Sequence, residues 1–491
     1  LWIKNLISKS IGIDPKKILF SEHHLSHAAS AYFCSPFDEA AVLTFDGVGE
    51  WSTTTMGIGK GNKLTLNREL RFPHSIGLLY SAFTAFLGFE INEGEYKVMG
   101  MAPYGIPKYI DQVWEVCQQS ENGAFRLNPE YFSLHYSAKH SYTHKFEKLF
   151  GRPRDPKVDF FTKETGFATY FGPRPNNYDE LCDYNQHYAD IAASIQRVTE
   201  ELIINLANEV FRETGLKRLC LAGGVALNSV ANTRIWQETP FEELYIQPSA
   251  GDGGGALGAA LYAWHTILGN SQRFVMDHAY WGSSFNDDQI HAELTQHGLN
   301  FQHVDDDSKL VEMAVDRLVS GKVMGLFQGR SEWGPRALGN RSIIADPRDQ
   351  GMKDLVNNKI KFREPFRPFA PAVPVEDCQQ FFDLPDPMNN YPGRFMLMVV
   401  PVHENKRDTI PAVNHMGTAR VQTVHRDHSP LYYDLAKTFG SATGVPVLLN
   451  TSFNVAGEPI VDSPRDAVNT FYNSGIDNLI LGNFILEKSG Y

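Results

Sequence analysis

The spacing of apolar residues in the middle of the chain identifies one face of a long helix. The positions that recur three or four residues apart are Ile191, Ile195, Val198, Leu202, Leu206 and Val210. This spacing places side chains on one side of an α-helix, and a glycine just beyond it, Gly215, is typical of a helix end. The pattern predicts a long amphipathic helix whose apolar face packs in a core.

Two apolar runs, residues 218–222 and 244–247, each lead into a glycine-containing loop and then a helical segment. Glycines between a strand and a helix place backbone N–H groups and the positive end of the helix dipole where an anion can bind. Close helix–sheet packing selects the same small residues, so the loops favour a nucleotide cleft without requiring one. The loop residues of interest are Gly223, Gly224, Asn228 and Asp252.

A third apolar run, residues 40–45, ends in Asp46 and Gly47. A glycine-containing turn lets the backbone approach a ligand and can present a carboxylate beside phosphates or a metal. The same Asp-Gly pair is favoured in hairpin turns, so both interpretations stay open.

His23 and His27 are candidate metal ligands because they lie four residues apart. On a helix both imidazoles project from one face. With one carboxylate, for which Asp252 is the candidate, they form a set that suits Fe(II), Mn or Zn. Helix caps and polar networks show the same spacing, so the metal is one of two interpretations.

No helical or strand periodicity is evident from about residue 272 to residue 282. We therefore predict two domains, residues 1–275 and 276–491. The second domain mixes strand-like and helical segments and is predicted to be α+β. Its strand-like runs are 323–327, 395–402 and 445–449.

Cationic residues in the second half stand among rigidifying neighbours. Arg336 lies in a segment rich in glycine and proline, and Lys361, Arg363 and Arg367 alternate with aromatic and proline residues. Guanidinium groups on a stiff backbone suit bidentate binding of phosphate or carboxylate. The alternative is a solvated strand face with local salt bridges. In an acidic chain, the pattern favours a focused pocket for a small anion.

Asn450 and Ser452 follow the apolar run 445–449. A strand end with hydroxyl, amide and backbone N–H groups can bind an oxyanion or a phosphate. The same short segment is also compatible with a hydrogen-bonded turn.

Composition narrows the class of protein. The 491 residues are 42% hydrophobic and 21% charged, which is ordinary for a globular protein and too apolar for disorder. The 57 acidic and 45 basic residues give a net charge of −12, which disfavours non-specific binding of nucleic acid or an anionic membrane. No apolar run reaches membrane-spanning length. The five cysteines form no Cys-x-x-Cys pair, which favours reduced thiols in the cytoplasm.

Taken together and in order, these segments resemble a known family over essentially the whole chain, the bacterial O-carbamoyltransferases of the nodulation, cephamycin and aminoglycoside type. No single motif is as specific as the ordered set. The matching segments are residues 23–29, 45–47, 97–105, 223–228, 251–252, 334–339, 361–368 and 450–454.

The resemblance implies a two-part enzyme. Its N-terminal domain is expected to be an actin/sugar-kinase-like α/β domain, similar to the tRNA threonylcarbamoyl transferase, that binds ATP and a metal. Its α+β C-terminal domain is expected to form carbamoyl-adenylate and pyrophosphate from carbamoyl phosphate and ATP. The carbamoyl group then passes to a hydroxyl of a small molecule such as an antibiotic or a sugar. The implied cofactors are Mg²⁺ with ATP and Fe²⁺ or another divalent transition metal.

The resemblance also implies roles for individual residues. His23, His27 and Asp252 match the metal ligands, and Asp46 matches a cleft residue near the acceptor and the nucleotide. The expected catalytic residues are Arg336, Lys361, Arg367 and Asp46. The expected substrate- or nucleotide-binding residues are Arg420, Asn450, Ser452, Gly223, Gly224, Asn228 and Lys97. Arg363 is added to them from its position in the same run as Lys361 and Arg367, and not from the resemblance.

The chain departs from the family at its start, because Leu1 enters after the expected first strands, phosphate loop and general base. A chain without them is expected to form the adenylate but not to carbamoylate an alcohol. Two alternatives are a tRNA threonylcarbamoyl transferase and a non-catalytic nucleotide-binding module. The acidic charge and the fused second domain disfavour the former, and the clustered cations disfavour the latter. The acceptor, the metal and homo-oligomerisation stay open.

Overall fold

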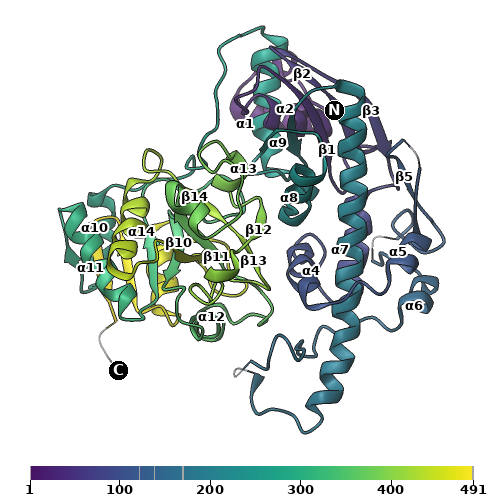
Figure 1. Cartoon of the computed structure of the whole chain (residues 1–491). Coiled ribbons are helices and arrows are strands. Elements are labelled where there is room, and N and C mark those ends of the chain that lie inside the picture. The colour runs from purple at the N-terminus through teal and green to yellow at the C-terminus, as the bar shows by residue number, and fades with distance from the viewer. Residues whose placement is uncertain (1, 121, 138, 169–170, 489–491) are drawn as a thin grey trace.

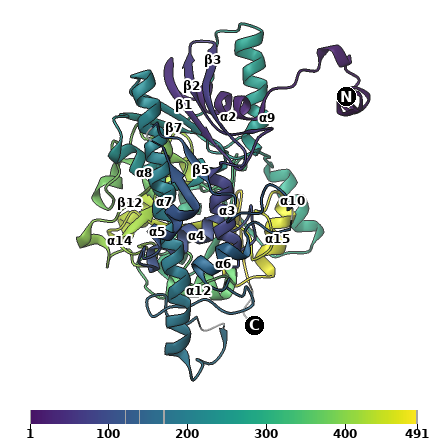
Figure 2. The same ribbon diagram turned by 90° about the vertical axis from the view of Figure 1, so that its right-hand side faces the viewer.

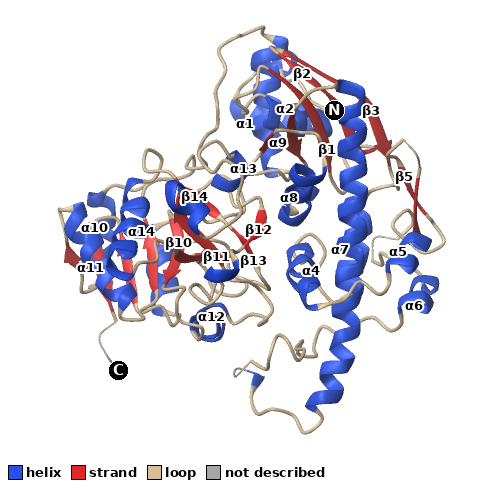
Figure 3. Cartoon of the chain, viewed as in Figure 1, coloured by secondary structure: helices blue, strands red, loops and turns tan. Residues whose placement is uncertain are grey.

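The computed structural model describes residues 2–120, 122–137, 139–168 and 171–488. They form two bodies that lie side by side, one built on a five-stranded sheet and the other on an eight-stranded sheet (Figure 1). Each body combines helices with its sheet (Figure 3), so the α/β class predicted from the sequence is confirmed.

The first sheet has the strand order β3-β2-β1-β6-β7. β1, β6 and β7 are parallel, whereas β2 and β3 are antiparallel additions at one edge. Nearly every residue of the parallel strands is buried, which explains their continuous apolar sequences. The strands are β1 (Glu39–Phe45), β2 (Ser52–Lys60), β3 (Lys63–Arg71), β6 (Arg218–Ala222) and β7 (Glu243–Ile246).

The helices of the first body include the long one predicted from apolar spacing. α7 (Tyr178–Thr214) buries the predicted apolar face and ends at Gly215, whose φ is 65°. α2 and α9 pack so closely that a Cβ on Gly258 would lie 1.8 Å from the Ser26 carbonyl oxygen, so this contact requires glycine. The remaining elements are α2 (His23–Tyr32), α3 (Ile76–Phe86), α4 (Glu95–Met101), α5 (Ile110–Val116), α6 (His144–Phe150), α8 (Ser229–Glu238), α9 (Gly253–Tyr262), β4 (Cys117–Gln119) and β5 (Phe125–Leu127).

The N-terminal helix α1 (Trp2–Ile11) buries none of its residues and stands apart from the rest of the first body (Figure 2). Among the described residues, no helix combines the length and the apolar character needed to cross a bilayer.

The second sheet has the strand order β14-β11-β15-β10-β9-β16-β17-β8. Its strands β9, β10 and β11 are fully buried, and α11 packs against α14 beside it. The strands are β8 (Gln302–His303), β9 (Met324–Phe327), β10 (Arg341–Ala345), β11 (Ala370–Pro374), β14 (Gln422–Val424), β15 (Leu448–Ser452), β16 (Asn478–Leu481) and β17 (Phe484–Glu487). The helices are α10 (Asp287–Gln296), α11 (Asp307–Val319), α12 (Met352–Val356), α13 (Tyr391–Arg394), α14 (Pro430–Thr443) and α15 (Pro464–Tyr472).

The strand predicted at residues 395–402 is much shorter in the structure. Only β12 (Val399–Pro401) is extended, paired with β13 (Thr418–Arg420). The preceding apolar residues belong instead to a buried loop, in which Met396 adopts a left-handed φ of 56°. Phe395, Met396 and Leu397 pack into the core of the first body and Met398 into that of the second, so burial and not a strand explains their apolar character.

The two bodies meet along α8 and β12. The Asn232 side chain donates to the Leu397 carbonyl at 3.0 Å, and the Val399 N–H donates to the Thr233 hydroxyl at 3.0 Å. The predicted domain boundary between residues 275 and 276 falls in a connecting segment that precedes α10. The division into domains 1–275 and 276–491 stays a prediction.

A buried histidine at this junction makes folding stability depend on pH. His415 donates from Nε2 to the Gly100 carbonyl at 3.3 Å, and burial, together with nearby Lys353, lowers its pKa to about 4. Because an unfolded histidine titrates near 6.5, the stabilisation is complete above that pH and is lost as the pH falls toward 4. At pH 5 the loss is about 2 kcal/mol.

We therefore expect His415→Gln, which keeps an N–H donor but cannot titrate, to lose about 2 kcal/mol less stability than the wild type between pH 7 and pH 5. Urea unfolding of the wild type and the variant at pH 7 and pH 5 measures the loss of stability in each protein. Equal losses in the two proteins would contradict this assignment.

Candidate functional site

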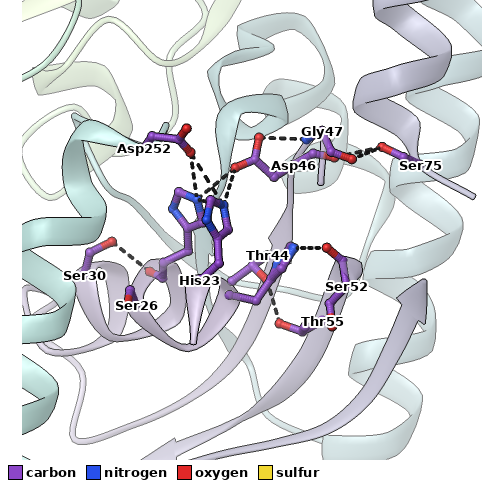
Figure 4. Close-up of polar contacts among 12 residues, drawn as sticks. His23, Ser26, Ser30, Thr44, Asp46, Gly47, Ser52, Thr55, Ser75 and Asp252 are labelled. Atoms are coloured by element: carbon purple, nitrogen blue, oxygen red, sulfur yellow. Dashed lines mark hydrogen bonds and ion pairs between the residues drawn. The ribbon is translucent and has the colours of Figure 1, made fainter. Parts of the chain in front are cut away.

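Four side chains from three separate elements meet in the first body (Figure 4). His23 and His27 lie one turn apart on α2, Asp46 follows the end of β1, and Asp252 immediately precedes α9. The ligand atoms of the four residues all lie within 4.8 Å of one another. The helical spacing and the two strand ends predicted from the sequence therefore converge on one place.

The distances in this cluster fit a bound cation. The Nε2 atoms of His23 and His27 are 3.0 Å apart, and Asp46 Oδ2 lies 3.1 and 2.8 Å from them. Asp252 Oδ1 lies 3.5 and 3.6 Å from the same two nitrogens. Two imidazole nitrogens this close repel unless a proton or a cation lies between them. Nitrogen and carboxylate ligands suit a divalent transition metal.

Burial and hydrogen bonding adjust the charges in the cluster. Burial alone would raise the pKa of Asp46, but hydrogen bonds from His23 and His27 hold it well below its usual range. The hydrogen bond to Asp46 in turn raises the pKa of His23. The His27 side chain is 1% exposed, whereas that of Asp252 is 81% exposed. The cluster thus has a buried floor and one solvent-facing carboxylate.

Two further residues, neither of them among the predicted site residues, support the histidines. The backbone N–H of His23 donates to both Glu50 carboxylate oxygens at 3.2 Å, which places an acid at the start of α2. His24 contacts the Thr44 hydroxyl at 2.7 Å and the Ser52 carbonyl at 2.9 Å. Glu50 lies 27 residues from His23 in sequence, so no local pattern points to this contact.

The glycine loop at residues 223–228 lies beside Asp46. A Cβ on Gly223, whose φ is 93°, would lie 2.1 Å from the Phe45 carbonyl oxygen, and one on Gly224 would lie 3.0 Å from Asp46 Oδ1. Asn228 caps α8 by accepting from the Ala231 N–H at 3.2 Å. Close packing thus explains the two glycines, and the predicted binding role of the loop stays a prediction.

The other predicted residues lie around a cavity of about 1210 Å³ between the two bodies. The first body contributes residues of α4 and α8 and of segments between residues 90 and 171, and the second body contributes the rest of the wall. The predicted residues that line it are Lys97, Arg336, Lys361, Arg363, Arg367, Arg420, Asn450 and Ser452. The structure therefore separates the predicted site residues into two groups, the histidine–aspartate cluster and this cavity, which we call the cationic pocket.

Lys361 is held in place by a ring of oxygen atoms. Its ammonium donates to the Ser452 hydroxyl and carbonyl at 3.1 and 2.5 Å, and to Asn454 Oδ1 and the Asn454 carbonyl at 2.7 and 2.9 Å. Asn454 was not among the predicted site residues, although it stands in the same short segment as Ser452. The sequence did offer a signal for Asn454, because it has an amide side chain and lies two residues after Ser452, a predicted binding residue.

Arg336 and Arg420 give the pocket its unsatisfied positive charge. Burial lowers the pKa of Arg336 to about 10. The pKa of Arg420 falls well below its usual range through burial and through Arg336, Arg363 and Arg367 nearby. Within the described residues, the Nε atom of each is buried without a hydrogen-bond partner. Crowded, desolvated guanidinium groups of this kind are stabilised by an anionic ligand.

Glu364 links this pocket to the first body. Its Oε1 lies 2.9 Å from the Lys97 ammonium, and its Oε2 lies 3.5 Å from Arg367. Although burial works to raise the pKa of Glu364, Lys97 and Arg367 hold it below its usual value. Arg367 also donates to the Tyr96 hydroxyl at 3.1 Å. Lys97, predicted to bind substrate, thus lines the pocket while paired with a carboxylate.

Two predicted binding residues already use several of their hydrogen-bonding groups in contacts within the protein. Arg363 donates to Asn357 Oδ1 at 2.8 Å and lies over the Phe369 ring at 4.4 Å. Asn450 is 1% exposed and donates to the Ala337 carbonyl at 3.0 Å. The second contact ties the loop that carries Arg336 to the middle of β15.

Glu332 shapes the loop that carries Arg336, because its Oε1 accepts from the N–H groups of Leu338, Asn340 and Arg341 at 2.7, 2.9 and 3.2 Å. Glu332→Ala leaves these donors without a partner, and we expect a loss of about 3 kcal/mol in the free energy of unfolding. Glu332→Gln keeps an oxygen at this place and is expected to lose less. Urea unfolding compares the two, and an alanine variant as stable as the glutamine variant would contradict this role.

Comparison with known proteins agrees with this two-part architecture. The family description "Carbamoyltransferase N-terminus" matches residues 4–261, and "Carbamoyltransferase C-terminus" matches residues 315–488. The chain is 44% identical to the uncharacterized protein sll1178 of Synechocystis sp., over 100% of this chain and 80% of that protein. It is 37% identical to nodulation protein NolNO of Sinorhizobium fredii, over 99% of this chain and 67% of the relative.

A third relative has an activity in its name. It is the 3'-hydroxymethylcephem-O-carbamoyltransferase of Amycolatopsis lactamdurans, which is 34% identical over 55% of this chain and 49% of that protein. Both parts of the chain match one enzyme family, and the interpretation as a non-catalytic module is therefore not supported. The chain belongs to the carbamoyltransferase family of transferase enzymes.

Proposed function

We propose that this chain is an ATP-dependent O-carbamoyltransferase that uses carbamoyl phosphate and a hydroxylated small-molecule acceptor. The observation that supports this most directly is the cationic pocket, where Arg336, Lys361, Arg367 and Arg420 surround one cavity and two buried guanidinium nitrogens lack a partner among the described residues. Carbamoyl phosphate and ATP are both polyanions, so bringing them together requires fixed cations that offset their repulsion.

The proposed reaction has three steps, and in each of them one bond forms and one bond breaks. Water cleaves carbamoyl phosphate to phosphate and carbamate. A carbamate oxygen then attacks the α-phosphorus of ATP and pyrophosphate leaves, which forms carbamoyl-adenylate. Finally the acceptor oxygen attacks the carbamoyl carbon, AMP leaves, and the hydroxyl proton passes to a base. The cations of the pocket serve the first two exchanges, because both develop negative charge on phosphate oxygens.

The histidine–aspartate cluster is proposed to hold a divalent transition metal, of which Fe²⁺ is the first candidate. His23, His27, Asp46 and Asp252 would be its ligands. Such an ion supplies Lewis-acid stabilisation of negative charge on the carbamoyl or phosphate oxygens during transfer. Because Asp46 lies within hydrogen-bond distance of both histidines, we propose that it is a metal ligand. This role adds to its predicted position near the acceptor and the nucleotide. Mg²⁺ is proposed to accompany ATP.

The acceptor is proposed to be a small natural product with a free hydroxyl, since one relative is named for a hydroxymethyl acceptor. A tRNA threonylcarbamoyl transferase is the alternative, and a gel shift with tRNA tests it. All five cysteines are free and buried, which agrees with the cytoplasm as the proposed compartment. Homo-oligomerisation stays open.

The decisive experiment incubates the chain with ATP, Mg²⁺, Fe²⁺ and carbamoyl phosphate and measures pyrophosphate release. We expect release that requires both substrates. Mass spectrometry of hydroxylated candidates added to the same mixture then tests whether any of them gains a carbamoyl group. If no pyrophosphate is released with Mg²⁺ and Fe²⁺ present, the proposed formation of carbamoyl-adenylate is wrong.

A further inference from the structure

Phe362 has a backbone conformation that aromatic residues rarely adopt. It follows a π-helical turn (Asn357–Lys361) with φ of 44° and ψ of 52°, in the left-handed region. A side chain with a Cβ is strained there, and a bulky residue is an outlier. Such strain persists where the surrounding structure imposes it, and it is concentrated at ligand-binding sites.

The neighbours of Phe362 on both sides are anchored. The Lys361 ammonium is held by Ser452 and Asn454, and the Arg363 guanidinium is held by Asn357 and the Phe369 ring. Because both flanking side chains have fixed partners, the backbone of Phe362 between them is held in the left-handed conformation. The contacts that position the cations thus also impose the conformation of Phe362.

Phe362 lines the cationic pocket and is 54% exposed. In the described part of the chain, its ring stacks on no other aromatic ring and carries no cation over its face. Val455 and Ala456, which follow Asn454, line the same cavity. The pocket therefore offers an uncovered apolar ring next to the groups that would bind phosphates.

Of the two substrates that the proposed adenylate-forming step brings into this pocket, only one has a surface that fits this ring. Carbamoyl phosphate is small and polar throughout, whereas ATP carries a flat purine with an apolar face. We propose that Phe362 is the stacking residue for the adenine ring of ATP, with its conformation set by the anchored cations on either side. This inference rests on the proposed function and adds the nucleobase subsite to it.

Binding of ATP compared with binding of inorganic tripolyphosphate tests the assignment, because tripolyphosphate has the phosphates without the base. We expect Phe362→Ala to weaken ATP binding about ten-fold or more and to leave tripolyphosphate binding unchanged. Phe362→Trp keeps a stacking surface and should restore ATP binding. Isothermal titration calorimetry of the full chain measures both ligands.

Two further variants separate the ring from other effects. Phe362→Asn suits the left-handed backbone but lacks the ring, so it should behave as the alanine variant does. Tyr472→Ala removes an exposed aromatic residue outside the pocket and should bind ATP as the wild type does. Equal weakening of both ligands in the Phe362 variants would reveal a backbone effect and overturn the inference, as would unchanged ATP binding.

The failure of this inference can be told apart from failure of the proposed function. Suppose that the wild type releases pyrophosphate and that Phe362→Ala has the same ratio of ATP affinity to tripolyphosphate affinity as the wild type. In that case only the proposed nucleobase subsite is wrong. If the wild type releases no pyrophosphate, the proposed function itself is wrong.

Discussion

Lys361→Ala is expected to reduce pyrophosphate release from ATP and carbamoyl phosphate by about 10²–10³-fold. Lys361 is 4% exposed at the wall of the cationic pocket, and four oxygen atoms of Ser452 and Asn454 fix the position of its ammonium. A cation that is already oriented stabilises developing negative charge without reorganisation, so its loss raises the activation barrier directly. Burial, together with Arg363 and Arg367, lowers the pKa of Lys361 well below its usual range. This indicates a site in which positive charge is costly until an anion binds.

Two comparisons make this result interpretable. Lys361→Met preserves most of the side-chain volume without the charge, so a loss shared with Lys361→Ala assigns the effect to the ammonium. Lys309→Ala changes an exposed lysine of α11 and should release pyrophosphate at the wild-type rate. Thermal unfolding of each variant checks that the fold is intact. Release that stays unchanged in both Lys361 variants would show that the reaction takes place elsewhere.

His27→Ala is expected to lower the affinity for Fe²⁺ by more than roughly 100-fold, while pyrophosphate release continues. His27 is buried at the floor of the cluster, and its Nε2 lies within hydrogen-bond distance of both His23 and Asp46. Removing it eliminates the best-positioned nitrogen ligand. The cationic pocket does not include any residue of the cluster, so formation of the adenylate should not depend on His27.

Equilibrium dialysis with Fe²⁺ followed by elemental analysis measures this change directly. His144→Ala, which alters a histidine with a 78% exposed side chain on α6, is the matched control and should retain the wild-type affinity. For any acceptor found by mass spectrometry, carbamoylation should be lost in His27→Ala and retained in His144→Ala. Wild-type metal affinity in His27→Ala would rule out the cluster as the metal site.

Local patterns in the sequence determined a substantial part of this protein. The helical spacing of apolar residues from Ile191 to Val210 identified α7 because burial of one face requires that period. The interval of four residues between His23 and His27 placed both imidazoles on one face of α2. The cations at Arg336, Lys361, Arg363 and Arg367 were identified as a group because rigid neighbours restrict where their charges can lie. These are properties of residues close together in the chain.

Only the tertiary structure decided which of these groups meet. Asp46 and Asp252, 206 positions apart in the sequence, approach the same two histidines. They follow β1 and β7, which run parallel in one sheet with β6 between them. Glu364 and Lys97 pair across the two bodies, and Glu332 organises a loop through three backbone contacts. The buried loop at 395–398 was mistaken for a strand, because apolar composition records burial and not backbone conformation. Long-range contacts depend on how distant segments pack, and such packing leaves no periodic signal in a single sequence.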